Sequence, residues 1–204
     1  MRRSLAFFGA FNPPTRAHID LAAYAMKATG RDDVIYVPSK TEYIRYEQKK
    51  DYAFSDESRL MMLARIAQNR PWMRYTDIEM QQSRQPKTYR TLCALRDRGE
   101  NPSLLLGADK LNELEHEWQF IPEIASEFGI VCLGRSGIDC EGIIANDPFL
   151  NSLNIELVTP PAEYKDISST RARQCLFHIT QMAGELRDIL PPELMNIPSE
   201  VLMK

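Results

Sequence analysis

The chain has 204 residues, of which 44% are hydrophobic and 26% are charged, and its formal net charge at pH 7 is -3. This length fits one α/β domain with a substantial core, and the composition excludes a disordered or fibrous chain. The weakly acidic charge argues against a protein that coats nucleic acid, which needs a clear excess of lysine and arginine, but leaves small phosphorylated ligands open.

Short β-prone runs alternate along the chain with segments of helical period, which predicts a parallel sheet with crossover helices. The expected strands cover residues 5–8, 34–37, 75–79, 104–106, 130–133 and 155–158. The expected helices cover residues 16–29, 56–69 and 89–98, and helical periodicity returns from residue 169 until prolines interrupt the tail. These elements predict a single α/β domain over residues 1–204 whose C-terminal part is helical.

The ends and faces of the helices follow from residue type. Thr15 can cap the first helix and Ser55 or Asp56 the second, and a glycine follows the first helix at Gly30. The apolar faces are expected at Ile19, Ala22, Ala23 and Met26, then at Leu60, Met61, Leu63, Ala64 and Ala67, then at Tyr89, Leu92 and Leu95. Residues 39–54 have no clean period and predict a loop with a short helix, and long loops of this kind tend to be functional.

Targeting and cysteine signals indicate a reducing, aqueous compartment. Two arginines precede the first apolar run, as in a signal peptide, but Asn12-Pro13-Pro14 interrupts that run before any cleavage site. No apolar run in the sequence approaches the roughly 20 residues that span a bilayer. The cysteines form no C-x-x-C pair and lie in or beside apolar runs, which predicts reduced, mostly buried thiols and no zinc site: Cys93, Cys132, Cys140 and Cys175. We expect a cytoplasmic protein without a membrane or nucleic-acid partner, and a homo-oligomer stays open.

The junction between the first strand and the first helix, residues 8–18, is the most informative segment. Gly9 and Ala10 are small enough for the backbone to approach a ligand, and the free N–H groups at the helix start favour a phosphate. His18 in the first turn can stabilise charge that develops when a phosphoanhydride breaks, and Thr15 offers a hydroxyl on the same face. A tight strand–helix turn with a satisfied histidine is the alternative. Neither Walker nor G-x-G-x-x-G spacing is present, which argues against a P-loop kinase and a dinucleotide oxidoreductase.

This segment resembles the (H/T)-x-G-H signature of the nucleotidyltransferases, which in that family follows a G-[GS]-x-F-[DN]-P turn. Thr15 matches the variant in which threonine replaces the first histidine. Ala10 stands at the second small position, and Ala17 stands where glycine is usual. Ala17 slightly narrows the approach to phosphate but leaves His18 in place.

A second segment, residues 167–173, resembles the I-S-S-T-x-[IV]-R element of the same family. It offers hydroxyls and N–H groups at a helix start, with Arg173 one turn further on the same side. The resemblance implies triphosphate binding by this segment. A simple helix cap is the alternative for Ser-Ser-Thr on its own.

A third segment selects among members of the family. Gly107-Ala108-Asp109, with Trp118 downstream, looks like the G-A-D-x-[LF]…W stretch of nicotinate or nicotinamide mononucleotide adenylyltransferases. The resemblance implies that Asp109 holds the nucleotide ribose or metal-bound phosphate and that Trp118 stacks on a pyridine ring. Core packing is the alternative role for Trp118.

Two further features of the family have weaker counterparts here. Residues 88–92 resemble the T-[YW]-x-x-[DE]-T-L region in compressed form, with Arg90 where an acid is common. The N–H groups at this helix start could donate hydrogen bonds to a carboxylate. A plain N-capped helix explains them almost as well. Lys40 and Lys49 stand where the family places basic residues near the phosphates, although a single lysine is usually a solvated surface charge.

The resemblance extends from residue 4 to about residue 175 and implies a Rossmann-like α/β fold. It implies transfer of the adenylyl group of ATP to nicotinic acid mononucleotide in NAD biosynthesis, with Mg²⁺ bound with ATP and not by protein side chains. It assigns catalysis to His18 and Arg173; ATP binding to Gly9, Ala10, Phe11, Thr15, His18, Lys49, Gly107, Asp109, Ile167, Ser168, Ser169, Thr170 and Arg173; and acceptor binding to Asn12, Lys40, Thr88, Tyr89 and Trp118.

Three alternatives stay open at this point. The acceptor could be nicotinamide mononucleotide, since loop geometry decides whether the site takes a carboxylate or an amide on the pyridine ring. A sister transferase of the cytidylyl or pantetheine-phosphate type is disfavoured by the Gly107-Ala108-Asp109 stretch. A non-catalytic nucleotide sensor is disfavoured by retention of both His18 and Arg173.

Overall fold

The structure of the protein is a computed structural model that describes residues 2–50, 52–135, 137–160, 167–177 and 179–195. A six-stranded parallel sheet has the strand order β3-β2-β1-β4-β5-β6. The strands are β1 (Arg3–Gly9), β2 (Asp33–Pro38), β3 (Met73–Tyr75), β4 (Asn101–Gly107), β5 (Ile130–Leu133) and β6 (Glu156–Val158). This is the doubly wound order of nucleotide-binding α/β folds, so the Rossmann-like prediction is confirmed.

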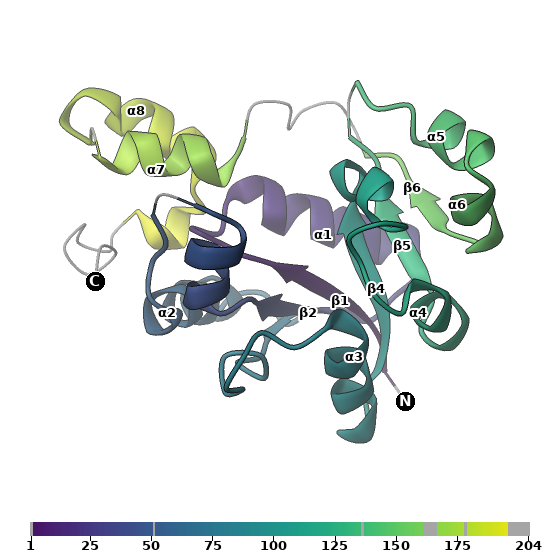
Figure 1. Cartoon of the computed structure of the whole chain (residues 1–204). Helices are drawn as coiled ribbons and strands as arrows, with labels where there is room; N and C mark the ends of the chain where they lie inside the picture. Colours follow the sequence, from purple (N-terminus) through teal and green to yellow (C-terminus); the bar gives the residue numbers. More distant parts are fainter. Residues whose placement is uncertain (1, 51, 136, 161–166, 178, 196–204) are drawn as a thin grey trace. The chain divides into compact units, whose positions relative to one another are not determined.

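Helices flank the sheet (Figure 1). The α-helices are α1 (Arg16–Ala28), α2 (Asp56–Ala67), α3 (Thr88–Asp97), α4 (Ile121–Glu127), α5 (Cys140–Asn146), α6 (Pro148–Ser152), α7 (Ser169–Phe177) and α8 (Ile179–Ile189). Shorter helical turns cover Tyr43–Glu47 (π), Ala108–Glu113 (3-10) and Pro192–Leu194 (3-10). The helical C-terminal segment is as predicted. Within the described residues, no helix is long and apolar enough to span a membrane.

The chain folds as two compact units. Unit 1 comprises Met1–Phe8, Ala23–Ile35 and Pro86–Lys165, and unit 2 comprises Gly9–Ala22, Tyr36–Gln85 and Asp166–Lys204. The boundaries fall inside β1, α1 and β2, so both units draw on the same first elements of the chain. The single domain expected over residues 1–204 stays a prediction.

One expected strand is displaced. The run over residues 75–79 was expected to be extended, but β3 ends at Tyr75, and Thr76 makes a last backbone bond to Tyr36 O at 3.0 Å. Beyond it the backbone turns, because Gln81 N donates to Asp77 O at 3.1 Å and the Asp77 carboxylate accepts from the Gln81 side chain at 2.7 Å. Aspartate competes for local hydrogen bonds in this way and favours a turn over a strand.

The buried face of α2 is also rotated from the one expected. Its N-cap is Ser55, whose side chain accepts from Ser58 N at 3.1 Å. The buried positions are Ser58, Arg59, Met62, Leu63 and Ile66, whereas Leu60, Met61, Ala64 and Ala67 are half-exposed. The expected face was wrong because only apolar residues were counted. Arg59 lies four residues before Leu63 on the buried face, but an arginine was not counted as a buried position. The face of α1 is as predicted at Ile19, Ala22 and Met26.

Candidate functional site

The turn between β1 and α1, residues 9–15, is built around a buried aromatic ring. Phe11 has φ of 44° and is 1% exposed, and its ring lies 5.3 Å from the rings of both His18 and Tyr36. A Cβ on Gly9 would stand 3.2 Å from the Phe11 ring, so a larger residue here would press against the ring and require it to shift slightly. Phe11 was expected to contact ATP, and its buried ring leaves only its backbone for that contact.

The side chain of Asn12 holds this turn to the segment that precedes α2. Its Nδ2 donates to Tyr52 O at 2.8 Å and its Oδ1 accepts from Phe54 N at 2.9 Å, and the residue is 1% exposed. The sequence resemblance placed Asn12 against the acceptor substrate. In the structure, both ends of its amide bind the protein's own backbone, so Asn12 orders the turn.

Two carbonyl groups at the start of the turn accept hydrogen bonds from other segments of unit 2. Gly9 O accepts from Ser39 N at 3.0 Å, and Ala10 O accepts from Arg59 Nη1 at 2.9 Å. An anion-binding turn must keep its carbonyl oxygens away from the ligand and leave its N–H groups toward it. These contacts hold two carbonyls in that way.

The C-terminal motif supplies the donors for two further carbonyls of the turn, those of Asn12 and Pro13. Arg173 Nη1 donates to Asn12 O at 2.7 Å, and Ser169 Oγ donates to Pro13 O at 2.8 Å. The structure therefore brings together the two motifs that sequence analysis linked only through the family pattern, across more than 150 residues of chain.

The other residues of the C-terminal motif have a capping role. Ser168 Oγ accepts from Arg171 N at 3.1 Å, which is the geometry of an N-cap for α7. Arg173 Nη2 donates to Thr170 Oγ1 at 3.2 Å, and Ile167 is half-buried. Ser168 thus caps the helix, as the alternative interpretation of the Ser-Ser-Thr run expected, while Ser169 and the guanidinium reach the turn. Triphosphate binding by this segment stays a prediction.

His18 and Thr15 form a reciprocal cap at the start of α1. Thr15 N donates to His18 Nδ1 at 3.0 Å, and His18 N donates to Thr15 Oγ1 at 3.5 Å, as in a capping box with histidine in the third helical position. A backbone N–H can only donate, so Nδ1 is the acceptor and the ring proton lies on Nε2. The Thr15 hydroxyl, 2.7 Å from Nδ1, then donates to it as well. Thr15 fixes the imidazole, and Nε2–H is the group that His18 can offer to an anion.

Neither predicted lysine is tied to the turn by a contact among the described residues. Lys40 Nζ donates to Met80 O at 2.9 Å, and Lys40 N donates to Gln85 Oε1 at 2.9 Å. Lys49 is exposed and has a positive φ of 50°. Lys40 thus binds residues that follow β3 in the chain. Lys49 is exposed in the loop that follows the π-helical turn.

Arg59 was not predicted from the sequence. Its charged side chain is fully buried in unit 2, in contact with the turn. It is 0% exposed and reaches Phe54 O with Nε at 3.3 Å and Asp56 Oδ1 with Nη2 at 2.5 Å, besides Ala10 O. Burial lowers the pKa of Arg59 to about 10, and the neighbouring Asp56 carboxylate opposes that shift. The signal that could have found it was its helical spacing from Leu63.

Unit 1 holds the third motif at the end of β4. A Cβ on Gly107 would lie 2.6 Å from Asp109 Oδ1, so the carboxylate folds over the glycine backbone and would have to move if the residue were larger. The Asp109 side chain is 54% exposed, and Lys110 Nζ lies 4.0 Å from its Oδ2. Trp118 is half-buried, in the segment between the 3-10 helix and α4. It keeps exposed surface, unlike a tryptophan packed in a core.

The start of α3 carries the predicted acceptor residues Thr88 and Tyr89. Lys87 occupies the N-cap position without a side-chain cap bond, so a plain N-capped helix does not account for this segment. Tyr89 OH donates to Glu127 Oε1 at 2.7 Å, which raises the pKa of Tyr89 to about 12, and its ring stacks on Phe120 at 5.4 Å. Tyr89 thereby ties the start of α3 to α4.

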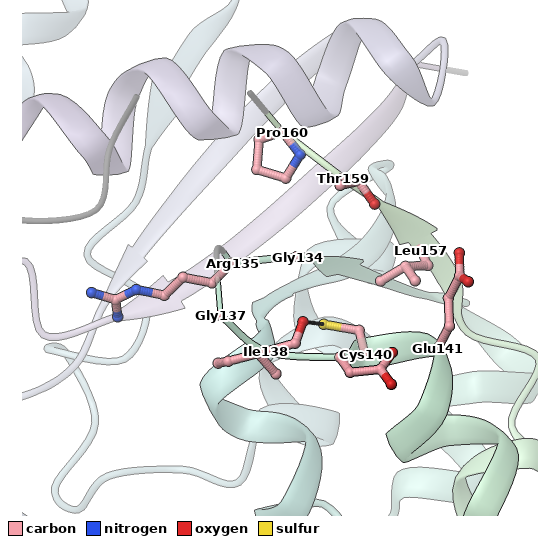
Figure 2. A pocket seen from close by; sticks show the side chains of 10 residues that line it. Gly134, Arg135, Gly137, Ile138, Cys140, Glu141, Leu157, Thr159 and Pro160 are labelled. Atoms are coloured by element: carbon pink, nitrogen blue, oxygen red, sulfur yellow. Dashed lines mark hydrogen bonds between the residues drawn. The ribbon is translucent and has the colours of Figure 1, made fainter. Parts of the chain in front are cut away.

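A cavity of about 410 Å³ in unit 1 lies at the carboxyl ends of β5 and β6 (Figure 2). Gly134, Cys140, Glu141 and Thr159 line it, and the Arg135 side chain extends away from Cys140 and Glu141. Ligands of doubly wound sheets bind in the crevice outside the carboxyl ends of the strands. The sequence offered no motif for this cavity.

The thiols agree with the prediction of reduced, mostly buried cysteines, since all four are free and only Cys93 is partly exposed. Burial and the neighbouring Cys140 raise the pKa of Cys132 to about 12. Among the described residues, no group of three or more His, Cys, Asp or Glu side chains could hold a metal ion.

Comparisons with known proteins agree with this geometry. A family model described as Cytidylyltransferase-like matches residues 6–175. A "Probable nicotinate-nucleotide adenylyltransferase" of Chlorobaculum tepidum is 28% identical over 174 residues, which is 84% of this chain and 85% of the relative. A "Nicotinamide/nicotinic acid mononucleotide adenylyltransferase" of Arabidopsis thaliana is 28% identical over 186 residues, covering 82% of this chain and 77% of the relative.

A solved structure supports the fold. The nicotinic acid mononucleotide adenylyltransferase of Plasmodium falciparum, solved with NaAD, has a TM-score of 0.72 at 18% identity and covers 96% of this chain and 94% of its own. At this identity the likeness concerns the fold.

Proposed function

Because the chain belongs to the cytidylyltransferase-like family, we propose that it transfers the adenylyl group of ATP to nicotinic acid mononucleotide, giving nicotinic acid adenine dinucleotide and pyrophosphate in NAD biosynthesis. The relative from Chlorobaculum tepidum, which matches over most of both chains, supports this choice of acceptor, and the name of the Arabidopsis thaliana relative includes it beside the amide form. The observation that carries the proposal is the junction in unit 2 where Arg173 and Ser169 bind the carbonyls of the turn that precedes His18.

In the proposed reaction, a phosphate oxygen of the mononucleotide attacks the α-phosphorus of ATP. The bond between the α-phosphorus and the bridging oxygen of the β-phosphate breaks, and pyrophosphate leaves with the electron pair. No protein nucleophile takes part. Catalysis of such a transfer comes from holding the two nucleotides in line and from neutralising the leaving group.

His18 is proposed to act as a fixed hydrogen-bond donor. Its Nδ1 accepts from Thr15, so Nε2–H is the donor of a ring that Thr15 and Phe11 hold in place. A preorganised donor stabilises charge developing on the leaving oxygen without reorganising during the reaction. The occupied Nδ1 argues against a role for His18 as a general base.

Arg173 is proposed to add a permanent positive charge beside the same phosphates. Its guanidinium already lies at the turn, where Asn12 O and Thr170 Oγ1 accept from it. A planar guanidinium can bind two phosphate oxygens at once, which suits it to a triphosphate. The exposed Lys49 is proposed to approach the phosphates once ATP is bound.

We propose that Mg²⁺ enters as part of the substrate, MgATP, and neutralises charge on the phosphate oxygens. The half-exposed Asp109 carboxylate is the group we assign to the ribose or to metal-bound phosphate.

On the acceptor side, we propose that Trp118 stacks on the pyridine ring and that the N–H groups at the start of α3, near Thr88, receive its carboxylate. Within unit 1, Tyr89 supports the start of α3 through its bond to Glu127. Lys40, in unit 2, is proposed as a further acceptor contact, and its Nζ donates to Met80 O. We expect Asn12 to act on the acceptor only through the shape of the turn.

The test is pyrophosphate release with ATP and Mg²⁺, comparing nicotinic acid mononucleotide with nicotinamide mononucleotide at equal concentration. We expect the acid form to react faster, and equal or reversed rates would contradict the preference for the carboxylate. Cytidine triphosphate with a range of phosphorylated acceptors provides the second arm. Turnover confined to that arm would assign a sister transferase, and ATP binding without turnover on any acceptor would indicate a sensor.

A further inference from the structure

Arg59, in the first turn of α2, joins the phosphate-binding turn to the segment between β2 and α2. We propose that Arg59 is a positioning residue for ATP, which holds the Ala10 carbonyl in the protein so that the turn presents its N–H groups to the triphosphate. The inference rests on the proposed function, because it assumes that the turn binds the phosphates of ATP.

The contacts of Arg59 converge from both segments. Nη1 donates to Ala10 O at 2.9 Å in the turn, and Nε donates to Phe54 O at 3.3 Å in the preceding segment. Nη2 donates to Thr41 Oγ1 at 3.0 Å and to Asp56 Oδ1 at 2.5 Å. All three guanidinium nitrogens are therefore used, and the side chain is fully buried.

This arrangement suits arginine in particular. A buried charge is tolerated when it is paired and hydrogen-bonded, and Asp56 supplies the opposite charge. The rigid planar fork fixes the direction of each donor, which a lysine ammonium with its flexible stem does not do. Ala10 O is thus held at a defined position by a group that has no freedom to turn.

Asn12 makes the reciprocal connection. Its amide reaches from the turn to Tyr52 O and Phe54 N, while Arg59 reaches back to Ala10 O and holds Phe54 O. The peptide groups of Phe54 are therefore fixed on both the N–H and the C=O side. Two cross-links between the same segments prevent the turn from rotating as a whole, which a single link would allow.

The consequence for the ligand is electrostatic. An unrestrained Ala10 carbonyl could rotate its oxygen toward the phosphates, where its partial negative charge would repel the triphosphate. Arg59 prevents this rotation, and because Asp56 pairs with its charge, its influence on the triphosphate comes from the fixed direction of the Ala10 carbonyl. Its effect on ATP should then exceed the effect on a ligand without a triphosphate.

The test compares Arg59→Gln with Arg70→Gln as a matched control. Arg70 follows the same helix and lies in the same unit, but its Nη1 donates to Ile66 O at 2.8 Å and to Glu193 Oε1 at 2.5 Å. Calorimetry would measure MgATP binding, initial rates would give KM for each substrate, and thermal unfolding would report stability. Both variants should lower the unfolding midpoint.

We expect Arg59→Gln to weaken MgATP binding by roughly 10- to 100-fold and to change KM for the mononucleotide by less than about threefold. Arg70→Gln should leave MgATP binding within about twofold of the wild type. Arg59→Lys, which keeps the charge and loses the fork, should bind ATP nearly as weakly as Arg59→Gln. Unchanged MgATP binding in Arg59→Gln, or an equal loss in Arg70→Gln, would overturn the inference.

Thr41→Val keeps the test decisive if Arg59→Gln does not fold, because it removes one acceptor of Arg59 and leaves the guanidinium in place. A loss of MgATP affinity of about threefold is expected, and wild-type affinity would overturn the inference. Failure of the inference about Arg59 is distinguishable from failure of the proposed function. A wild-type protein that binds no MgATP overturns both, whereas wild-type turnover together with Arg59→Gln binding at wild-type strength overturns the inference alone.

Discussion

The turn in unit 2 and the segment from Thr88 to Trp118 in unit 1 are held in different ways. In the turn, the carbonyls of Gly9, Ala10, Asn12 and Pro13 accept from donors on three other segments. In unit 1, α3 starts without a side-chain cap, the Asp109 side chain is 54% exposed and Trp118 is half-buried. For the proposed function, the difference predicts that phosphate binding depends on long-range preorganisation of the turn, whereas acceptor binding depends on more exposed side chains with fewer backbone contacts.

The largest expected effect comes from His18, whose replacement should lower catalysis far more than it lowers stability. His18→Ala removes the Nε2–H donor, so we expect kcat for pyrophosphate release to fall by roughly 100- to 1,000-fold. Loss of the reciprocal cap with Thr15 should cost only about 1 kcal/mol of unfolding free energy. Steady-state rates and denaturant unfolding measure the two quantities.

The matched control is His116→Ala, because the His116 side chain is 74% exposed and belongs to unit 1. It should leave both quantities unchanged. Near-wild-type pyrophosphate release by His18→Ala would remove His18 from the mechanism and leave it as a capping residue of α1.

Sequence predicted those parts of the site that depend on local order along the chain. The first motif is a strand, a glycine turn and a helix start, so its elements and the capping role of Thr15 follow from neighbouring residue types. The parallel sheet followed from the alternation of strands and helices, whereas the order of its strands was not predicted. The juxtaposition of Ser169 and Arg173 with the turn came from the family pattern, since nothing local to either segment points to the other.

What the sequence could not give were interactions that depend on tertiary packing. The role of Arg59 was missed because an arginine in a helix is usually exposed, and only the packed structure shows that α2 buries it. The hydrogen bonds of the Asn12 amide to the backbone of Tyr52 and Phe54 could not be predicted, because these partners lie about 40 residues away along the chain. The helices α4, α5 and α6 were not predicted because each is seven residues or shorter, which is too few for a helical period.

The next largest effect concerns Trp118 and tests whether this residue of unit 1 binds the acceptor. Trp118→Ala should raise KM for nicotinic acid mononucleotide by roughly 10-fold, because a stacked aromatic contributes about 1 kcal/mol or more to ring binding. KM for ATP should change by less than about twofold. Initial rates with each substrate varied in turn would measure the split.

Packing and stacking roles of Trp118 predict opposite outcomes. A tryptophan that served the core would cost about 3 kcal/mol or more of unfolding free energy when truncated, with equal changes in both KM values. A half-buried stacking residue should cost less than that and act on one substrate. Trp118→Phe should recover most of the acceptor affinity, since a smaller aromatic ring can still stack.

The smallest effect concerns the departure from the family pattern at Ala17. Ala17 is the second residue of α1 and is 8% exposed, so its methyl group packs against the protein and leaves the His18–Thr15 cap untouched. Ala17→Gly should lower KM for ATP by no more than about threefold, through slightly closer approach of the phosphate. It should also cost up to about 1 kcal/mol of unfolding free energy, because glycine disfavours the helix. A change in KM for ATP above about 10-fold would mean that the Ala17 methyl borders the phosphates directly, and the preorganisation of the turn would then have to include its steric fit as well as its carbonyl contacts.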